Sequence, residues 1–396
     1  MYPGIVQQIF DDHYPAVNAA HSLDERARTA AWDIRTCRTR LQGYHVDACP
    51  NGDYSVVLNN SCGHRSCPQC GATDTELWIE RQLAKEIRCP HHQIVFTCTD
   101  LLRPLWRWNR KLFTNLYFRA AWHSLRALLA DAKHLGALPG VIAVFQSWSD
   151  ELVEHLHIHF IVTSGGIDAN GKWVEANPEF LVCARALMKK FRGKFLAYLR
   201  EAFATHTSSG RRKPADEILV PPPGETVQRC LNLFNKLGRQ EWHVQVEDAY
   251  PYAHGAIKYT GRYIRRGPIS ERRIVSYNGD RVVIAYAHPE KHNRSTFSLD
   301  ANQFILRLLS HVPQKGTHCA RVYGLYHSAC RDRLNQARSQ HSQPPYVPEV
   351  EPPDRHELMH RMFPDFTGDL CPKCHARLHT IYVDRRAHSP PQKLAA

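Results

Sequence analysis

The sequence contains no apolar run that approaches the roughly 18–20 residues a helix needs to cross a bilayer. Its opening segment, MYPGIVQQIFDDHYP, has two aspartates and no basic stretch, so it does not have the pattern of a secretory signal. No internal repeat of solenoid period is present either. We therefore expect a cytoplasmic protein whose cysteines serve as metal ligands or buried thiols and do not form disulfides.

Acidic residues are scarce relative to basic ones. The 396-residue chain carries 51 Lys and Arg against 38 Asp and Glu, a net charge of +13. A chain this basic is most simply explained by a polyanionic partner, of which nucleic acid is the commonest, although a basic surface without a role is the alternative. Hydrophobic residues make up 43%, which excludes disorder throughout, and the 25 His and 13 Cys suggest bound metals.

Composition divides the chain into three parts. Residues 1–75 are predicted to form a helical and zinc-binding module, and residues 76–312 an α+β catalytic domain with an antiparallel sheet and a helical insertion at about 176–240. Residues 313–396 form a C-terminal extension with a Pro-rich linker. The elements predicted from hydrophobic periodicity and turn residues are helices at 22–36, 105–132, 188–200 and 254–266, strands at 92–99, 141–148, 157–163 and 242–248, and a hairpin at 273–287.

The segment EHLHIHF at residues 154–160 carries histidines at alternate positions. In a strand, His155, His157 and His159 project to one face while the intervening apolar residues face the core. Two imidazoles on one face, ~7 Å apart along the backbone, can hold one divalent cation and leave positions open for a substrate. Surface histidines on an amphipathic strand are the alternative interpretation.

A metal held by two histidines usually needs a third ligand, and oxygen suits Mg²⁺ or Mn²⁺. The preceding strand offers Gln146 and Asp150, and either can reach the same face if the two strands pair as a hairpin. We expect Asp150, because its charge suits a hard cation.

Residues 258–266 read KYTGRYIRR. On a helix, Tyr259 and Tyr263 lie one turn apart on one face. A phenol is a poor nucleophile at its ordinary pKa of ~10, so attack on phosphorus needs a metal that polarises the phosphate. Half-buried packing tyrosines are the alternative. The surrounding positive charges, candidates for DNA contacts, are Lys258, Arg262, Arg265 and Arg266.

The spacing Cys62-x4-Cys67-x2-Cys70 is that of a zinc half-site, because a Cys-x2-Cys turn lets two thiolates meet one tetrahedral ion. So small a segment has little core without a metal. We expect Cys49 and, less firmly, His45 to complete the zinc site. Two further assignments stay open: His64 is a possible substitute ligand, and Cys37 is either a ligand or a buried thiol.

The C-terminal tail contains a second Cys-x2-Cys turn, Cys371-Pro-Lys-Cys374, but the sequence shows no obvious second pair of ligands for it. Whether this pair binds metal stays open at this point, with Cys319, His327 and Cys330 as possible partners. The cysteines expected to be buried thiols are Cys89, Cys98, Cys183 and Cys230.

Taken in order, these motifs resemble the HUH single-strand endonucleases, and among them the two-tyrosine transposases of rolling-circle insertion sequences with an N-terminal zinc-binding domain. That family often has a second Cys-x2-Cys where this chain has Cys49-Pro-Asn-Gly52. The resemblance covers most of the chain and rests on residues 37–39, 62–70, 92–104, 148–159, 258–269, 304–313 and 321–324.

The resemblance implies an HUH-like antiparallel sheet with packed helices, in a bacterial, nucleoid-associated DNA transposase. It implies that a tyrosine cuts single-stranded DNA at element ends and keeps the 5′ phosphate, while a 3′-OH is released and later reverses the linkage. It assigns His157 and His159 to a Mg²⁺ or Mn²⁺ site, Asp150 to an acidic or amide ligand position, and Tyr259 and Tyr263 to attack. His155 is expected to support the metal ligands. The remaining alternatives are a rolling-circle replication initiator or relaxase, with the same chemistry, and a non-catalytic zinc-containing DNA-binding regulator.

Overall fold

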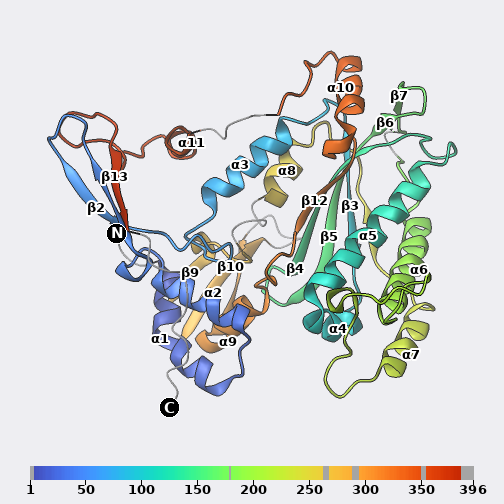
Figure 1. Cartoon of the computed structure of the whole chain (residues 1–396), viewed down its shortest axis with the longest axis horizontal. Helices are drawn as coiled ribbons and strands as arrows, with labels where there is room; N and C mark the ends of the chain where they lie inside the picture. Colours follow the sequence, from blue (N-terminus) through green and yellow to red (C-terminus); the bar gives the residue numbers. More distant parts are fainter. Residues whose placement is uncertain (1–3, 178–179, 262–266, 288–293, 349–353, 385–396) are drawn as a thin grey trace.

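The computed structural model describes residues 4–177, 180–261, 267–287, 294–348 and 354–384 (Figure 1). Of the residues predicted to act in the site, Tyr263, Arg262, Arg265 and Arg266 lie outside this described part. Helices and antiparallel sheets are mixed along the chain, which confirms the α+β class.

A five-stranded sheet forms the centre of the larger half of the molecule (Figure 1). The strand order is β12-β4-β5-β3-β8, and every neighbouring pair is antiparallel. Both faces of its two middle strands are buried, so alternate side chains along each strand enter two different environments. The strands are β3 (His91–Thr97), β4 (Gly140–Trp148), β5 (Glu154–Thr163), β8 (Val244–Val246) and β12 (Ala320–Gly324).

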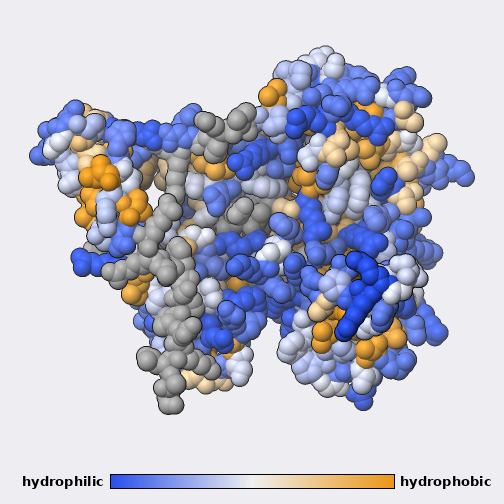
Figure 2. Space-filling view, in the orientation of Figure 1, coloured by the Kyte–Doolittle hydropathy of each residue, from blue (hydrophilic) through white to orange (hydrophobic). Residues whose placement is uncertain are grey.

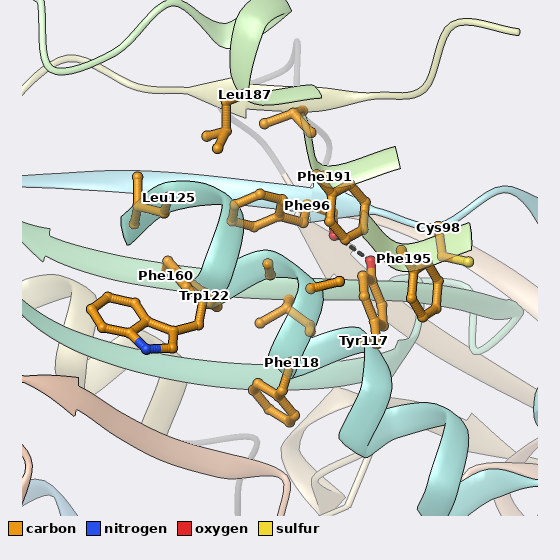
Figure 3. Packing of buried hydrophobic residues seen from close by; sticks show 14 of the residues in the cluster. Phe96, Cys98, Tyr117, Phe118, Trp122, Leu125, Phe160, Leu187, Phe191 and Phe195 are labelled. Atoms are coloured by element: carbon orange, nitrogen blue, oxygen red, sulfur yellow. Dashed lines mark hydrogen bonds between the residues drawn. The ribbon is translucent and has the colours of Figure 1, made fainter. Parts of the chain in front are cut away.

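One face of this sheet carries the main aromatic core (Figure 3). Phe160 of β5 and Phe96 of β3 lie with ring centroids 5.1 Å apart, and Phe191 stacks edge-on against Phe96. The hydroxyl of Tyr117 donates to the Phe96 carbonyl over 2.6 Å, so even the polar tip of this buried ring is satisfied. The helices of this layer are α4 (Arg103–Trp108), α5 (Arg110–Leu129), α6 (Ala184–Ala202) and α7 (Val227–Leu237).

The opposite face of the sheet is covered in part by three other helices. Ile142 of β4 and Ile161 of β5 pack in one cluster with Ile79 and Ile257, which come from two of these helices. The histidines of β5 share this face, because residues 157, 159 and 161 alternate with the aromatic-core positions. The three helices are α3 (Ala72–Leu83), α8 (His254–Gly261) and α10 (Arg331–Gln340).

A second unit combines the N-terminal helices with a segment nearly 270 residues further along the chain. Phe10 and Phe304 lie in its core. The predicted helix near residue 25 is present, and its N-cap is Asp24, whose carboxylate accepts from the Ala27 amide over 2.9 Å. The elements are α1 (Ile5–Ala20), α2 (Glu25–Thr36), α9 (Ala301–Ser310), β9 (Ile274–Tyr277), β10 (Arg281–Ala287) and β11 (Arg294–Asp300).

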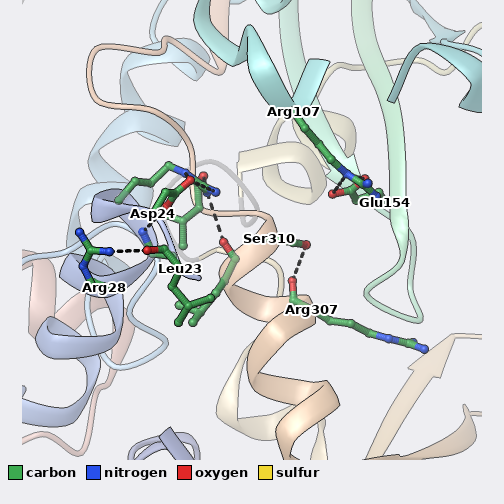
Figure 4. A network of polar contacts seen from close by, with 11 residues as sticks. Leu23, Asp24, Arg28, Arg107, Glu154, Arg307 and Ser310 are labelled. Carbon is green, nitrogen blue, oxygen red and sulfur yellow. Dashed lines mark hydrogen bonds and ion pairs between the residues drawn. The ribbon is translucent and has the colours of Figure 1, made fainter. Parts of the chain in front are cut away.

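The tip of the β4–β5 hairpin is tied to this second unit through its backbone carbonyls. Arg307 of α9 donates to the Glu151 carbonyl over 2.9 Å, and His311 Nε2 donates to the Leu152 carbonyl over 3.0 Å. At the base of the same turn, Arg107 forms an ion pair with Glu154 (Figure 4). The hairpin is therefore held at its tip as well as along its strands.

The remaining elements are short. The sheet β13-β1-β2 joins the C-terminal tail to the N-terminal region. None of the helices in the described part of the chain is both long enough and apolar enough to span a membrane. These elements are β1 (Tyr44–Ala48), β2 (Ser55–Asn59), β6 (Gly165–Ile167), β7 (Trp173–Glu175), α11 (Arg355–Met362) and β13 (His379–Asp384), with 3-10 turns η1 (Arg40–Gln42), η2 (Asp100–Leu102), η3 (Ala215–Glu217), η4 (Glu271–Arg273) and η5 (Ser328–Cys330).

Candidate functional site

The histidines of β5 form a row on one face of the sheet. The ring centroids of His157 and His159 are 4.8 Å apart, and those of His155 and His157 are 5.0 Å apart. His157 and His159 are buried, whereas His155 is only partly covered. The strand geometry predicted from the alternating sequence is therefore present.

Burial keeps the two inner imidazoles neutral. Loss of solvent lowers the pKa of His157 to about 3 and that of His159 to about 4, because a buried cation is poorly solvated. At neutral pH each ring therefore has one nitrogen with a free lone pair, the form in which histidine binds metals.

The hydrogen bonds identify that nitrogen in His157. Its Nδ1 lies 3.0 Å from the His155 carbonyl and must donate to it, which leaves Nε2 with the lone pair. This Nε2 lies 2.9 Å from Oε1 of Gln146, which is also a lone-pair atom. A cation between the two atoms, or a rotation of the Gln146 amide, satisfies both.

His159 adds an unpaired nitrogen to the same face. Its buried Nδ1 has no hydrogen-bond partner among the described residues, and neither does the amide nitrogen of Gln146. Buried polar atoms are rarely left unpaired in proteins, so such atoms point to a missing ligand. Two imidazoles and an amide oxygen fit a divalent cation with positions left for water and a phosphate oxygen.

The third ligand expected from the sequence was Asp150, but the strand register favours Gln146 for this position. Gln146 pairs directly with His157 in the β4–β5 register, whereas Asp150 lies in the exposed turn beyond the end of β4. Asp150 joins no group of potential metal ligands among the described residues, and its carbonyl accepts a hydrogen bond from Arg273. A charge preference selected Asp150, but the strand register favours Gln146.

Helix α8 holds Tyr259 and Lys258 on its exposed side. Ile257 on its buried side and Ala253, just before the helix, pack in one cluster with Ile161 of the histidine strand. Gly261 allows a close approach, because a Cβ at this position would lie 2.5 Å from Cγ1 of Ile79 in α3. The tyrosine helix is thereby fixed on the face of the sheet that carries the histidines.

Four buried cysteines meet near the N-terminus. The sulfur atoms of Cys37, Cys62, Cys67 and Cys70 all lie within 4.8 Å of one another, and Cys37 is 3.5 Å from Cys70. Hydrogen bonding among the sulfurs lowers the pKa of Cys37 and Cys70 and raises that of the other two thiols. Four sulfurs converging on one point match a tetrahedral zinc site.

The fourth member is Cys37, and two predicted ligands are therefore corrected. Cys49 lies in another cluster, with Cys371 and Cys374. His45 instead bonds through Nδ1 to Asn60 over 2.8 Å, because it lies on β1, away from the four sulfurs.

The second cysteine cluster answers the question that the sequence left open about the partners of the tail cysteines. Cys319, His327 and Cys330 do not join Cys371 and Cys374, since the chain returns to β1 and meets Cys49 there. Of the four expected buried thiols, Cys89, Cys98 and Cys230 are buried, but Cys183 is exposed where it precedes α6.

Comparison with known proteins agrees with these features. The model of a transposase family matches residues 140–333, which include the histidine strand and α8, and the model of a transposase zinc-binding domain matches residues 9–98, which include the four-cysteine cluster. No solved structure matches the chain significantly.

Two relatives match over long stretches. The protein y4qJ of Sinorhizobium fredii (strain NBRC 101917 / NGR234), which is named as a transposase, is 30% identical over 395 residues, covering 98% of this chain and 97% of the relative. The transposase for insertion sequence element IS801 of Pseudomonas savastanoi pv. phaseolicola is 28% identical over 295 residues, covering 73% of this chain and 67% of the relative.

Proposed function

The chain belongs to the IS91/IS801 family of transposases, and we propose that it cleaves and rejoins single-stranded DNA at the ends of its element through 5′-phosphotyrosine intermediates. The observation that carries this proposal is the meeting of the His157 and Gln146 lone pairs at 2.9 Å. This pair of side chains lies on the same face of the sheet as the helix that bears Tyr259.

His157, His159 and Gln146 would hold the catalytic cation, Mg²⁺ or Mn²⁺. When bound, the cation withdraws charge from the scissile phosphate and stabilises the charge that develops on the leaving oxygen. The chain contributes rigid ligands, because all three side chains lie on paired strands of one hairpin. Strand-borne ligands keep their separation better than ligands on a loop.

Tyr259 would act as a nucleophile. Its phenolic oxygen bonds to phosphorus and gives up its proton to water, while the bond from phosphorus to the 3′ oxygen breaks. The product is a DNA strand with a free 3′-OH and a second strand joined by its 5′ phosphate to the tyrosine. Attack by a 3′-OH on this linkage reverses the step and releases the tyrosine.

Tyr263, four residues further along the sequence, would serve as the second covalent carrier, so that one strand is held while another is cut. Lys258 is exposed beside Tyr259 and would bind a DNA phosphate together with the predicted Arg262, Arg265 and Arg266. The net charge of +13 favours a polyanionic substrate over the whole molecule.

The test uses oligonucleotides taken from the DNA that flanks the gene, labelled at one end and incubated with the protein and Mg²⁺ or Mn²⁺. A 3′ label should move with the denatured protein, because the 5′ phosphate stays on the tyrosine. A 5′ label should appear in a shorter free strand that ends in 3′-OH.

His157→Ala and His159→Ala are expected to abolish both products while DNA binding is largely kept, since binding depends on the basic residues. Full cleavage by either variant would refute the metal assignment. Reversible binding without any adduct from the wild-type protein would instead support a non-catalytic regulator.

A further inference from the structure

We propose that Cys49, Cys371 and Cys374 bind a second zinc ion, which fastens the C-terminal tail to the β1–β2 hairpin. The three sulfurs lie within 4.8 Å of one another, and those of Cys49 and Cys374 are 3.4 Å apart. Two thiolates bound to one zinc ion at ~2.3 Å each are separated by about 3.8 Å, so this cluster has the required dimensions. The matched family models cover residues 9–98 and 140–333, so neither includes the tail cysteines.

Backbone amides surround the sulfurs as they do in zinc-binding turns. The amides of Asn51 and Asp53 donate to Cys49, and those of Lys373 and Cys374 donate to Cys371. Such hydrogen bonds favour the thiolate, which is the form that binds metal, and the pKa of Cys371 is lowered, whereas burial raises that of Cys49. The two turns also match in sequence, since both begin Cys-Pro.

The side chain of Asn51 adds a further contact, because its amide lies 3.5 Å from the Cys374 sulfur. Gly52 stands where a fourth cysteine would complete the turn, and its φ of +76° favours glycine. Cys374 is exposed, so water can reach the cluster. Three thiolates with one water are a soft donor set that selects zinc over Mg²⁺ or Mn²⁺.

The sheet that these turns join has only a small apolar core among the described residues. β13 pairs with β1 along the backbone, but its side chains are mostly exposed. Among the residues that the structure describes, its hydrophobic cluster has three buried members, of which two are Cys49 and Cys371. Figure 2 shows apolar side chains on the surface where β2 and β13 lie, and the exposed ones are Val57, Ile381, Tyr382 and Val383.

A small sheet without a buried apolar face is marginally stable in water. A zinc ion between the β1–β2 turn and the tail supplies the missing cross-link, because the free energy of metal binding adds to the stability of the folded arrangement. The ion thereby joins a residue of the N-terminal module to residues that follow the Pro-rich linker. This role is independent of DNA cleavage.

The test is the zinc content of the full-length chain, purified under reducing conditions and measured by mass spectrometry of the metal. Wild-type protein should contain two zinc ions per chain. Cys371→Ser and Cys374→Ser should each contain one, Cys67→Ser should contain one, and Cys67→Ser combined with Cys374→Ser should contain none. Cys183→Ser, which changes an exposed cysteine outside both clusters, should keep two.

A second measurement avoids variants altogether and so does not depend on their folding. A protease cut in the Pro-rich linker should leave the tail fragment bound to the rest of the chain, and mild chelation should release both that fragment and one zinc. One zinc per wild-type chain, or a Cys374→Ser protein that retains two, would overturn the proposal. A tail fragment that stays bound after the second zinc has been removed would overturn its role as a fastener.

Discussion

The Nε2 atom of His157 lies 2.9 Å from Oε1 of Gln146, its direct partner across the β4–β5 ladder. Nδ1 of the same ring is engaged by the His155 carbonyl, so the two facing atoms are both lone-pair donors. Burial makes protonation of this imidazole costly and lowers its pKa to about 3. The pair is thus arranged to receive a cation at neutral pH.

Gln146→Ala should raise the concentration of Mg²⁺ or Mn²⁺ needed for half-maximal cleavage by roughly tenfold, the change that a loss of about 1.4 kcal/mol produces. Gln146→Glu should keep an oxygen ligand and remain active. The measurement is adduct formation across a metal titration. Asp150→Ala is the matched control and should leave the titration unchanged. If that variant needed the same tenfold increase in metal concentration, Asp150 would be identified as a ligand.

Tyr259→Phe and Tyr263→Phe should each impair complete transposition, because each half of a strand exchange needs its own covalent carrier. Nicking of an oligonucleotide is expected to survive in one of the two single variants, since one nucleophile suffices for one cut. The double variant should form no adduct. Mass spectrometry of the adduct checks this, and a double variant still linked to DNA through Tyr252 or Tyr277 would disprove the assignment.

Cys37→Ser should destabilise the protein by more than about 3 kcal/mol, because loss of a metal site is among the few large effects of a single substitution. Cys37 is buried in the core formed by α1, α2 and α9, so its zinc links these helices to residues 62–70. Denaturant unfolding with and without a chelator gives the measurement. Chelation should lower the free energy of unfolding of the wild-type protein much more than that of the variant. Cys183→Ser should behave as wild type in both conditions.

His91 should make the stability of the protein depend on pH. It is fully buried between the Cys89 carbonyl and the Tyr326 hydroxyl, and burial lowers its pKa to about 4. Between about pH 6.5 and pH 4 the imidazole is protonated in the unfolded state but not in the folded state. The free energy of unfolding is therefore at its full value above about pH 6.5 and falls as the pH decreases toward 4.

From pH 7 to about pH 4 this one residue should account for a loss of about 3 kcal/mol in the free energy of unfolding. Unfolding of wild type and His91→Gln across this range measures the effect as a difference in slope, whatever the variant's stability at pH 7. His21→Gln, which changes an exposed histidine at the end of α1, should keep the wild-type slope. Parallel curves for wild type and His91→Gln would show that His91 does not titrate in this way.

Local periodicity in the sequence was sufficient for the strands and helices that carry the proposed chemistry. Alternation along residues 154–160 predicted the histidine row on one face, and hydrophobic spacing predicted the helix that begins at His254. The Cys62, Cys67 and Cys70 spacing likewise indicated a zinc half-site. These patterns are local, so a few neighbouring residues determine which side chains share a face.

Tertiary structure alone decided which residues complete each site. Gln146 faces His157 because of the register between two strands, which residue charges do not reveal. The sequence favoured Cys49 over Cys37 as a zinc ligand, but helix α2 ends at the four-sulfur cluster, whereas β1 leads Cys49 to the returning tail. Such partners are selected by how the chain folds back on itself, and that choice depends on the packing of the whole molecule.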